Sequence, residues 1–110
     1  MPDPRERVYE VVRKIPRGMV LSYGDVAAAV SGVALTAHEV GQIMAMCPAD
    51  VPWQRVVARD GTLVIAKRNP AMAAEQRRLL EAEGVTFDAQ GRVRMDRHRW
   101  GLTESLFDGI

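Results

Sequence analysis

The residues that could do chemistry gather around a tryptophan in the stretch VPWQRVVARDG, residues 51–61. A proline-led loop that enters an apolar strand is a place where proteins often display a reactive side chain. Trp53 offers only an indole N–H donor, and the neighbouring Gln54 cannot accept a proton at neutral pH. A buried indole is more often a core aromatic whose N–H bonds a carbonyl. The stretch by itself therefore favours a structural tryptophan and leaves a binding role open.

Cys47, the one cysteine of the chain, is the other candidate for a reactive group. A thiol needs a neighbouring base or positive charge to become a nucleophilic thiolate. Cys47 precedes Pro48 and has no histidine beside it, and an isolated cysteine usually behaves as a small buried hydrophobe. A single cysteine also excludes an internal disulfide and a Cys-x-x-Cys metal site. We expect neither a metal nor a cofactor.

The composition is that of an ordinary globular domain. The chain has 110 residues, of which 47% are hydrophobic and 26% are charged, and this is enough apolar material for one core. We expect a single domain over residues 1–110, with a core of about 4–88 and a basic, aromatic tail of about 92–110. The N-terminus is charged and lacks the apolar segment of a signal peptide. We therefore expect a monomeric cytoplasmic protein with no membrane partner.

The charge distribution leaves nucleic-acid binding open. A net charge of +1 argues against a protein that coats nucleic acid through charge alone. Four arginines in the tail would form a phosphate-binding patch if they shared one face, although solvated surface charge explains them equally well. They are Arg92, Arg94, Arg97 and Arg99.

Helix signals fill the first half of the chain. Residues 3–4, Asp-Pro, predict an N-cap followed by proline at the first helical position, and residues 8–15 carry apolar side chains along one stripe. Two capping boxes follow, at Ser22–Asp25 and Thr36–Glu39, and each opens a short helix, the second of which reaches about Met46. Two short capped helices separated by a glycine-containing turn are typical of a helix-turn-helix.

The second half predicts short strands and one long helix. Residues 55–58 and 62–65 flank an Asp-Gly turn and predict a β-hairpin, which could act as a wing beside the helix-turn-helix. Residues 69–83 predict the longest helix, with a glycine as its C-terminal stop. Residues 85–87 and 93–95 predict a second small hairpin. The expected fold is mostly α with a small β-hairpin, of a winged helix-turn-helix-like type.

Five segments together resemble a known family. LSYGDVAAA, VGQIM, PWQRVV, DG and EQRRLLEAEGV occur in the order and approximate spacing of the DNA-binding domain of the O6-alkylguanine-DNA alkyltransferases. The resemblance extends from about Val8 to Val85 and implies the fold of the C-terminal domain of those enzymes. Where they carry Pro-Cys-His-Arg-Val, this chain has Pro-Trp-Gln-Arg-Val at residues 52–56. That variant is the hallmark of the alkyltransferase-like proteins, which this chain resembles.

The substitution has a direct chemical meaning. In the enzymes a cysteine thiolate attacks the alkyl carbon on guanine O6, and the alkyl group stays on sulfur. Here Trp53 replaces the nucleophile and Gln54 replaces the relay histidine, so only the orienting acid persists, as Glu83. The resemblance therefore implies a protein that is not an enzyme, in which the indole floors a pocket for a flipped nucleotide.

The resemblance also implies roles for other pocket residues. Tyr23 matches a tyrosine that pushes the target phosphate and contacts the guanine, and Val56 matches a backbone group that bonds the base edge. Met44 matches a residue on the alkyl side, and Arg68 loosely matches an arginine beside the alkyl group. Packing alone would also explain Tyr23 and Met44. The expected lesion-pocket residues are Tyr23, Met44, Trp53, Val56, Arg68 and Glu83.

The helix that begins at Ala37 matches the recognition helix, which in this family lies in the minor groove. Contact there carries little sequence information, as a lesion sensor requires. The arginine that the family inserts into the base stack is His38 here, and an ordinary surface role explains that histidine equally well. By the motif Arg55 would stabilise the pocket loop, although a surface charge would explain it equally well. The expected DNA-binding residues are Tyr23, Thr36, Ala37, His38, Gln42 and Arg55.

These inferences predict a non-enzymatic sensor that flips O6-alkylguanine out of duplex DNA and marks it for nucleotide excision repair. Its expected partners are double-stranded DNA that contains O6-alkylguanine and, by family implication, nucleotide excision repair proteins. When bound to DNA it would associate with the nucleoid. Two alternatives stay open: an active alkyltransferase that uses Cys47, and a winged helix-turn-helix transcription regulator.

Overall fold

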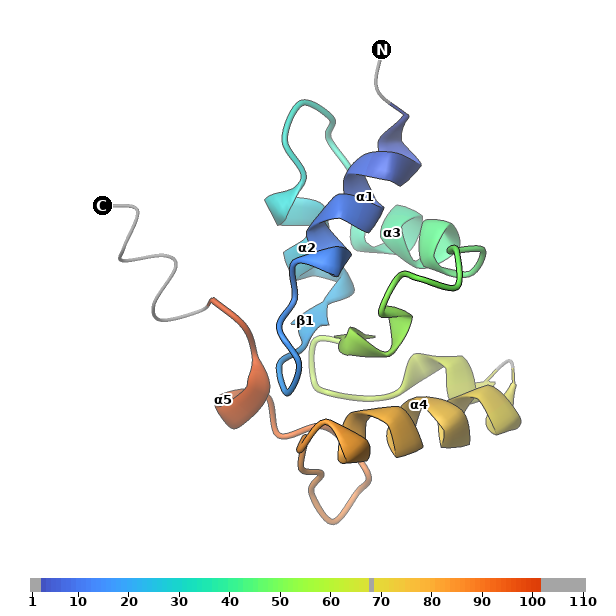
Figure 1. The fold of residues 1–110 in the computed structure, drawn as a ribbon, viewed down its shortest axis with the longest axis vertical. Coiled ribbons are helices and arrows are strands. Elements are labelled where there is room, and N and C mark those ends of the chain that lie inside the picture. The colour runs from blue at the N-terminus through green and yellow to red at the C-terminus, as the bar shows by residue number, and fades with distance from the viewer. Residues whose placement is uncertain (1–2, 68, 102–110) are drawn as a thin grey trace.

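The computed structural model describes residues 3–67 and 69–101. Its first helix, α1 (Pro4–Arg13), lies against the helices that follow it (Figure 1). The helix begins as predicted, because the Asp3 carboxylate accepts a hydrogen bond from the Arg5 N–H at 2.9 Å and proline occupies the first turn. Its buried residues are Val8, Tyr9 and Val12, and Ile15 is buried just beyond its end.

The predicted helix-turn-helix is confirmed as α2 (Tyr23–Ala29) and α3 (Ala37–Met44). Both helices have complete capping boxes, in which the hydroxyl accepts from a backbone N–H and the acid accepts in return. α3 ends at Met44, two residues before the expected end at Met46. The reason is local: the Met46 N–H turns back to the Ile43 carbonyl, and such tightening closes a helix.

A small parallel sheet lies at the centre of the fold. β1 (Leu21–Ser22) pairs with β2 (Val56–Val57), with Leu21 opposite Val56. The predicted pairing of residues 55–58 with 62–65 in a hairpin is therefore wrong, although the mostly helical fold class is confirmed. An apolar run predicts that a strand is buried but does not specify its partner.

Gly61 shows why the chain does not fold back along β2. The predicted Asp-Gly turn forms, and the Ala58 N–H donates to the Thr62 carbonyl at 3.0 Å. Gly61 has φ of 91°, and its carbonyl accepts from the Val93 N–H at 2.9 Å. A Cβ at Gly61 would lie 2.3 Å from the Val93 oxygen, so this approach requires glycine. The chain then continues into a 3-10 helix, η2 (Val64–Lys67).

The longest helix, α4 (Pro70–Ala82), matches its predicted start and stop. The Asn69 side chain caps the first turn by accepting from the Met72 N–H at 3.2 Å. Gly84 follows the last turn with φ of 90°. α4 packs against η2 and against a single 3-10 turn, η1 (Trp53–Arg55). η1 occupies a segment that the sequence predicts as loop and strand.

The chain then returns to β1. The second predicted hairpin is reduced to one antiparallel bridge between Phe87 and Val93, and Met95, expected in its second strand, begins a helix. After a short helix, α5 (Met95–His98), the Val20 N–H donates to the His98 carbonyl and the Trp100 N–H donates to the Val20 carbonyl, at 2.7 and 2.9 Å. We call residues 94–101 the C-terminal strap. The expected tail is thus an integral part of the fold as far as residue 101.

The sheet separates two clusters of buried side chains. Leu21 and Val56 belong to the cluster under α1, α2 and α3, whereas Val20 and Val57 belong to the cluster under α4. Successive side chains of a strand point to opposite faces, so two very short strands contribute to both cores. Within residues 3–67 and 69–101, no helix is long and apolar enough to cross a membrane.

Candidate functional site

A cavity of about 660 Å³ opens between the helix-turn-helix and α4. Its walls come from α2, α3, η1, η2 and α4, so segments far apart in the sequence meet around it. The described residues that line it are Tyr23, Ala37, His38, Gly41, Gln42, Met44, Ala45, Trp53, Val64, Ile65, Asn69, Met72 and Gln76.

The cavity brings together three of the expected pocket residues, from three different elements. Tyr23 is the first residue of α2, Met44 is the last of α3, and Trp53 opens η1. Tyr23 and Met44 also pack against the core cluster beneath the helix-turn-helix. Packing and cavity lining are therefore not exclusive for these side chains.

Three of the expected DNA-binding residues line the same cavity from α3. Ala37 and His38 are exposed at the start of that helix, and Gln42 is exposed one turn later. Thr36 is not among the described residues that line the cavity; its hydroxyl caps α3 by accepting from the Glu39 N–H at 3.1 Å.

Trp53 is half-buried and is held by the backbone of a tight turn. The backbone N–H of Trp53 donates to the Val51 carbonyl at 2.7 Å, and the Trp53 carbonyl accepts from the Val56 N–H as η1 closes. Val51, which precedes the loop, is buried in the core. The indole thus stands on a short segment that is anchored at both ends.

Glu83 lies outside the cavity, in a polar cluster behind η1. Its carboxylate accepts from Gln54 Nε2 at 2.7 Å, and from Nε and Nη2 of Arg55 at 2.9 and 3.1 Å. Arg55 Nη1 also donates to the Ile15 carbonyl at 2.8 Å. Arg55, an expected DNA-binding residue, therefore supports the loop through Glu83 and the end of α1.

The charge of Glu83 is stabilised by these bonds. Burial opposes ionisation of its carboxyl, but the hydrogen bonds from Arg55 and Gln54 outweigh burial and lower its pKa. The side chains of Glu83 and Arg55 are only 9% and 18% exposed. The cluster therefore holds an ionised acid and an amide, and an amide cannot carry a proton away from a nucleophile.

Of the other expected pocket residues, the structure describes Val56 but not Arg68. The Val56 side chain is buried in the core, and its carbonyl accepts from Gln76 Nε2 at 3.1 Å. Its backbone therefore adjoins a cavity-lining residue, while the side chain does not line the cavity. Arg68 lies outside the described residues.

Cys47 does not line this cavity among the described residues. It is half-buried against the core, and burial raises the pKa of its thiol. A raised pKa keeps sulfur in the unreactive thiol form at neutral pH. These features disfavour Cys47 as a nucleophile.

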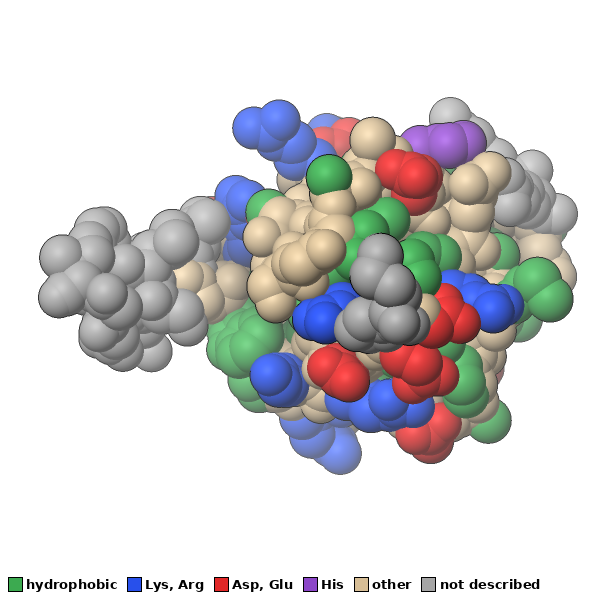
Figure 2. Space-filling model, turned by 90° about the horizontal axis from the view of Figure 1, so that it is seen from above, with side chains coloured by type: hydrophobic (Ala, Val, Ile, Leu, Met, Phe, Trp, Pro, Cys, Tyr) green, Lys and Arg blue, Asp and Glu red, His purple; other side chains and the backbone are tan. Residues whose placement is uncertain are grey.

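The arginines of the tail do not form one free patch. Arg92 pairs with Asp88 at 3.1 Å, and Arg99 Nε donates to the Asp25 carboxylate at 2.8 Å. Arg94 and Arg97 are exposed. On the face shown in Figure 2, acidic and basic side chains are intermixed.

The residues that the sequence did not indicate come mainly from η2 and α4. Asn69, Met72 and Gln76 lie on one face of α4, at helical spacing with the buried Leu80 and with Glu83. This periodicity was available as a signal, because residues three and four apart share a helix face. No periodic pattern marked Val64 and Ile65.

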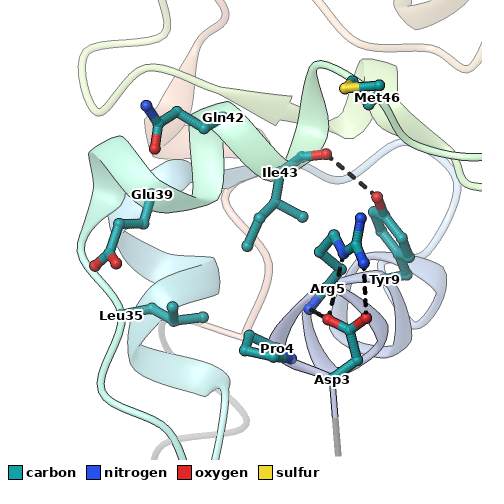
Figure 3. A pocket seen from close by; sticks show the side chains of 9 residues that line it. All are labelled: Asp3, Pro4, Arg5, Tyr9, Leu35, Glu39, Gln42, Ile43 and Met46. Atoms are coloured by element: carbon teal, nitrogen blue, oxygen red, sulfur yellow. Dashed lines mark hydrogen bonds and ion pairs between the residues drawn. The ribbon is translucent and has the colours of Figure 1, made fainter.

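A second cleft of about 450 Å³ lies on the other side of α3, against the start of α1 (Figure 3). Tyr9 donates its hydroxyl to the Ile43 carbonyl at 3.3 Å across it, and Arg5 pairs with Asp3 at its rim. Gln42 lines both hollows. In the part of the chain that is described, no group of His, Cys, Asp and Glu side chains could hold a metal ion.

Comparison with known proteins gives a family match over most of the chain. The family described as 6-O-methylguanine DNA methyltransferase, DNA binding domain, matches residues 3–85. A protein named DNA base-flipping protein from Escherichia coli (strain K12) is 38% identical over 97 residues, which are 86% of this chain and 72% of that protein. Alkyltransferase-like protein 1 of Schizosaccharomyces pombe is 43% identical over 83 residues, 72% of this chain and 73% of the relative.

Solved structures of related proteins superpose on this chain. Atl1 of S. pombe, in complex with damaged DNA that contains O6-carboxymethylguanine, superposes with a TM-score of 0.73 at 33% identity. The match covers 91% of this chain and 98% of that one. Mycobacterium tuberculosis OGT in complex with DNA gives a TM-score of 0.61 at 28% identity, over 76% of this chain and 50% of that protein.

Proposed function

This chain belongs to the family of 6-O-methylguanine DNA methyltransferase DNA-binding domains, and from this premise we propose that it is an alkyltransferase-like sensor of O6-alkylguanine in duplex DNA. It would flip the damaged nucleotide into the cavity between α3 and α4, hold it reversibly and transfer no alkyl group. Its relatives include DNA base-flipping proteins and an Atl1 that binds damaged DNA.

The observation that carries the proposal is the composition of the cavity wall. Tyr23, Met44 and Trp53 converge there, and the described lining residues include neither a thiol nor a carboxylate. Aromatic and apolar surfaces with a few amides suit an extruded base, which is held by stacking and hydrogen bonds. Such a wall can bind an alkylated base, and its described residues offer no thiolate to accept the alkyl group.

The position of α3 supports the way in which DNA would be held. Ala37 and His38 are exposed at its start, next to the cavity. A small alanine would allow close approach to a narrow minor groove, and His38 would enter the stack as the base leaves. Selectivity would then come from the cavity and from the lower cost of extruding a poorly paired base.

The decisive experiment compares two duplexes of one sequence, with guanine or O6-methylguanine at a central position. Fluorescence anisotropy at one stated salt concentration gives both dissociation constants, because charge contributions vary with salt. We expect binding of the lesion duplex to be tighter by about tenfold or more, or roughly 1.4 kcal/mol. Equal affinities would refute the sensor. Affinity for one undamaged sequence, with indifference to the lesion, would instead indicate a transcription regulator.

Absence of transfer is tested separately, by the intact mass of the protein after incubation with methylated DNA. We expect no change in mass. A stable gain of one methyl group, mapped to Cys47, would establish the alkyltransferase alternative.

Delivery of the lesion to nucleotide excision repair is a further part of the proposal. It rests on the family alone. A protein that grips a lesion without removing it requires a second activity to complete repair, and incision of lesion DNA by excision-repair proteins, with and without this chain, would test the handover.

A further inference from the structure

Gln76 is a polar side chain in an unusual place for one. It lies in the middle of α4 and is only 3% exposed. Its Nε2 lies 3.2 Å from the Gln54 carbonyl and 3.1 Å from the Val56 carbonyl, and donates to both. Burial of an amide is costly unless it is hydrogen-bonded. The two bonds therefore fix this side chain in one orientation.

The face of α4 that carries Gln76 contacts both the cavity and the segment that contains Trp53. Toward the N-terminus of the helix, Asn69 and Met72 line the cavity. Toward its C-terminal end, Glu83 binds the side chains of Gln54 and Arg55. Gln76 stands between them, where it lines the cavity and holds the backbone of η1 and β2.

The two carbonyls that Gln76 holds belong to the segment that presents the indole. Gln54 directly follows Trp53, and the Val56 N–H donates to the Trp53 carbonyl. A change in the orientation of these peptide groups would therefore move the indole relative to the cavity. The side chains of Gln54 and Arg55 are already fixed by Glu83, and Gln76 adds a restraint on the backbone of the same segment, at the Gln54 and Val56 carbonyls.

We propose that Gln76 is a positioning residue for lesion recognition: it holds the Gln54 and Val56 carbonyls so that Trp53 and the Val56 peptide present a fixed surface to the flipped base. This inference rests on the proposed function. Preorganisation of this kind favours binding, because the complex does not have to order the loop.

The test uses Gln76→Met, which keeps the length of the side chain, and Gln76→Glu, which keeps its shape; neither variant has the two N–H donors at neutral pH. For each, the anisotropy assay gives the ratio of affinities for lesion and undamaged duplexes. We expect this ratio to fall about tenfold, or roughly 1.4 kcal/mol, while binding of undamaged DNA changes little. Ala74→Met, an exposed change on α4, is the matched control and should keep the wild-type ratio.

A second measurement needs no DNA, so it tests the role of Gln76 separately from the proposed lesion-sensor function. In a Trp100→Phe background the only indole is Trp53, and its quenching by acrylamide should increase when Gln76 is replaced. If wild type shows no lesion preference, the proposed function fails, and quenching alone decides whether Gln76 positions the indole. Wild-type ratios and wild-type quenching in folded Gln76→Met and Gln76→Glu proteins would overturn the inference; if one variant does not fold, the other decides.

Discussion

At the scale of single residues, the side chains around Trp53 give Glu83 a fixed task. Its carboxylate accepts three hydrogen bonds, one from Gln54 and two from Arg55. A carboxylate in this setting orients its donors and keeps its charge. In the enzymes that this chain resembles, the corresponding acid orients a histidine base. Here the same position holds the side chains of Gln54 and Arg55, and the proton relay is absent from the Gln54–Glu83 contact.

Trp53→Cys tests this view of the residues. We expect the variant to transfer no methyl group from O6-methylguanine DNA, because Gln54 cannot accept the thiol proton and its amide is already bound to Glu83 at 2.7 Å. The measurement is the intact mass of the protein after incubation with methylated duplex. Trp53→Ser is the control, because serine is similar in volume to cysteine but has no thiol. Methylation of Trp53→Cys at a rate above this control would contradict the account.

At the scale of elements, the C-terminal strap determines how α2 is held. Arg99 pairs with Asp25, which is also the acid of the α2 capping box. Burial opposes charge on the Asp25 carboxyl, but hydrogen bonds from Arg99 and Ser22 prevail and lower its pKa. The strap thus reaches the first turn of the helix that carries Tyr23, so it helps to position a cavity residue from a distance in sequence.

A double-mutant cycle with Arg99→Met and Asp25→Asn measures this link. Because the pair is largely shielded, with side chains 28% and 18% exposed, we expect a coupling free energy of about 1 kcal/mol or more from urea unfolding. The exposed Arg78–Glu75 pair, at 66% and 43%, is a matched control, and its coupling should be clearly smaller because solvent screens exposed ion pairs. Equal couplings for the two pairs would show that the strap contributes no more than a surface ion pair.

At the scale of the whole molecule, the fold consists of two buried clusters joined by a minimal sheet and by ion pairs that cross between elements. Glu83 at the end of α4 reaches Arg55, the last residue of η1, and Asp25 in α2 reaches Arg99 in the strap. Both carboxyls have a lowered pKa in the folded protein. Global stability must therefore depend on pH in the acid range.

The sign of that dependence follows from the lowered pKa values. The unfolded chain takes up protons first, so the stabilisation is complete above the ordinary carboxyl pKa of about 4 and is lost as the pH falls through the lower folded-state pKa. Glu83→Gln should reduce the free energy of unfolding at pH 7 by roughly 2 kcal/mol. Its further decline below about pH 5 should be shallower than in wild type. Urea unfolding between about pH 3 and pH 7 measures this pH dependence, with the exposed Glu10→Gln variant as the control. If the free energy of unfolding of Glu83→Gln fell with pH in parallel with that of wild type, the prediction would be contradicted.

Local signals in the sequence were sufficient for the four longer helices, α1 to α4, but not for α5 or the two 3-10 helices. The N-caps at Asp3 and Asn69 and both capping boxes are confirmed, because a cap involves side chains and backbone only a few residues apart. The motif pattern also indicated three cavity residues, Tyr23, Met44 and Trp53, and the substitution that replaces the nucleophile. Those inferences needed residue identities and their order, both of which the chain displays directly.

Only the tertiary structure decided the long-range partners. The pairing of β2 with β1, the return of the strap to Val20 and the contact of Gln76 with two carbonyls each join segments at least twenty residues apart. An apolar strand needs a packing partner and a buried glutamine needs a hydrogen-bond partner, but neither residue type identifies that partner. That choice depends on which groups the packed cores bring within hydrogen-bond distance, because buried polar groups must be satisfied by whatever lies beside them.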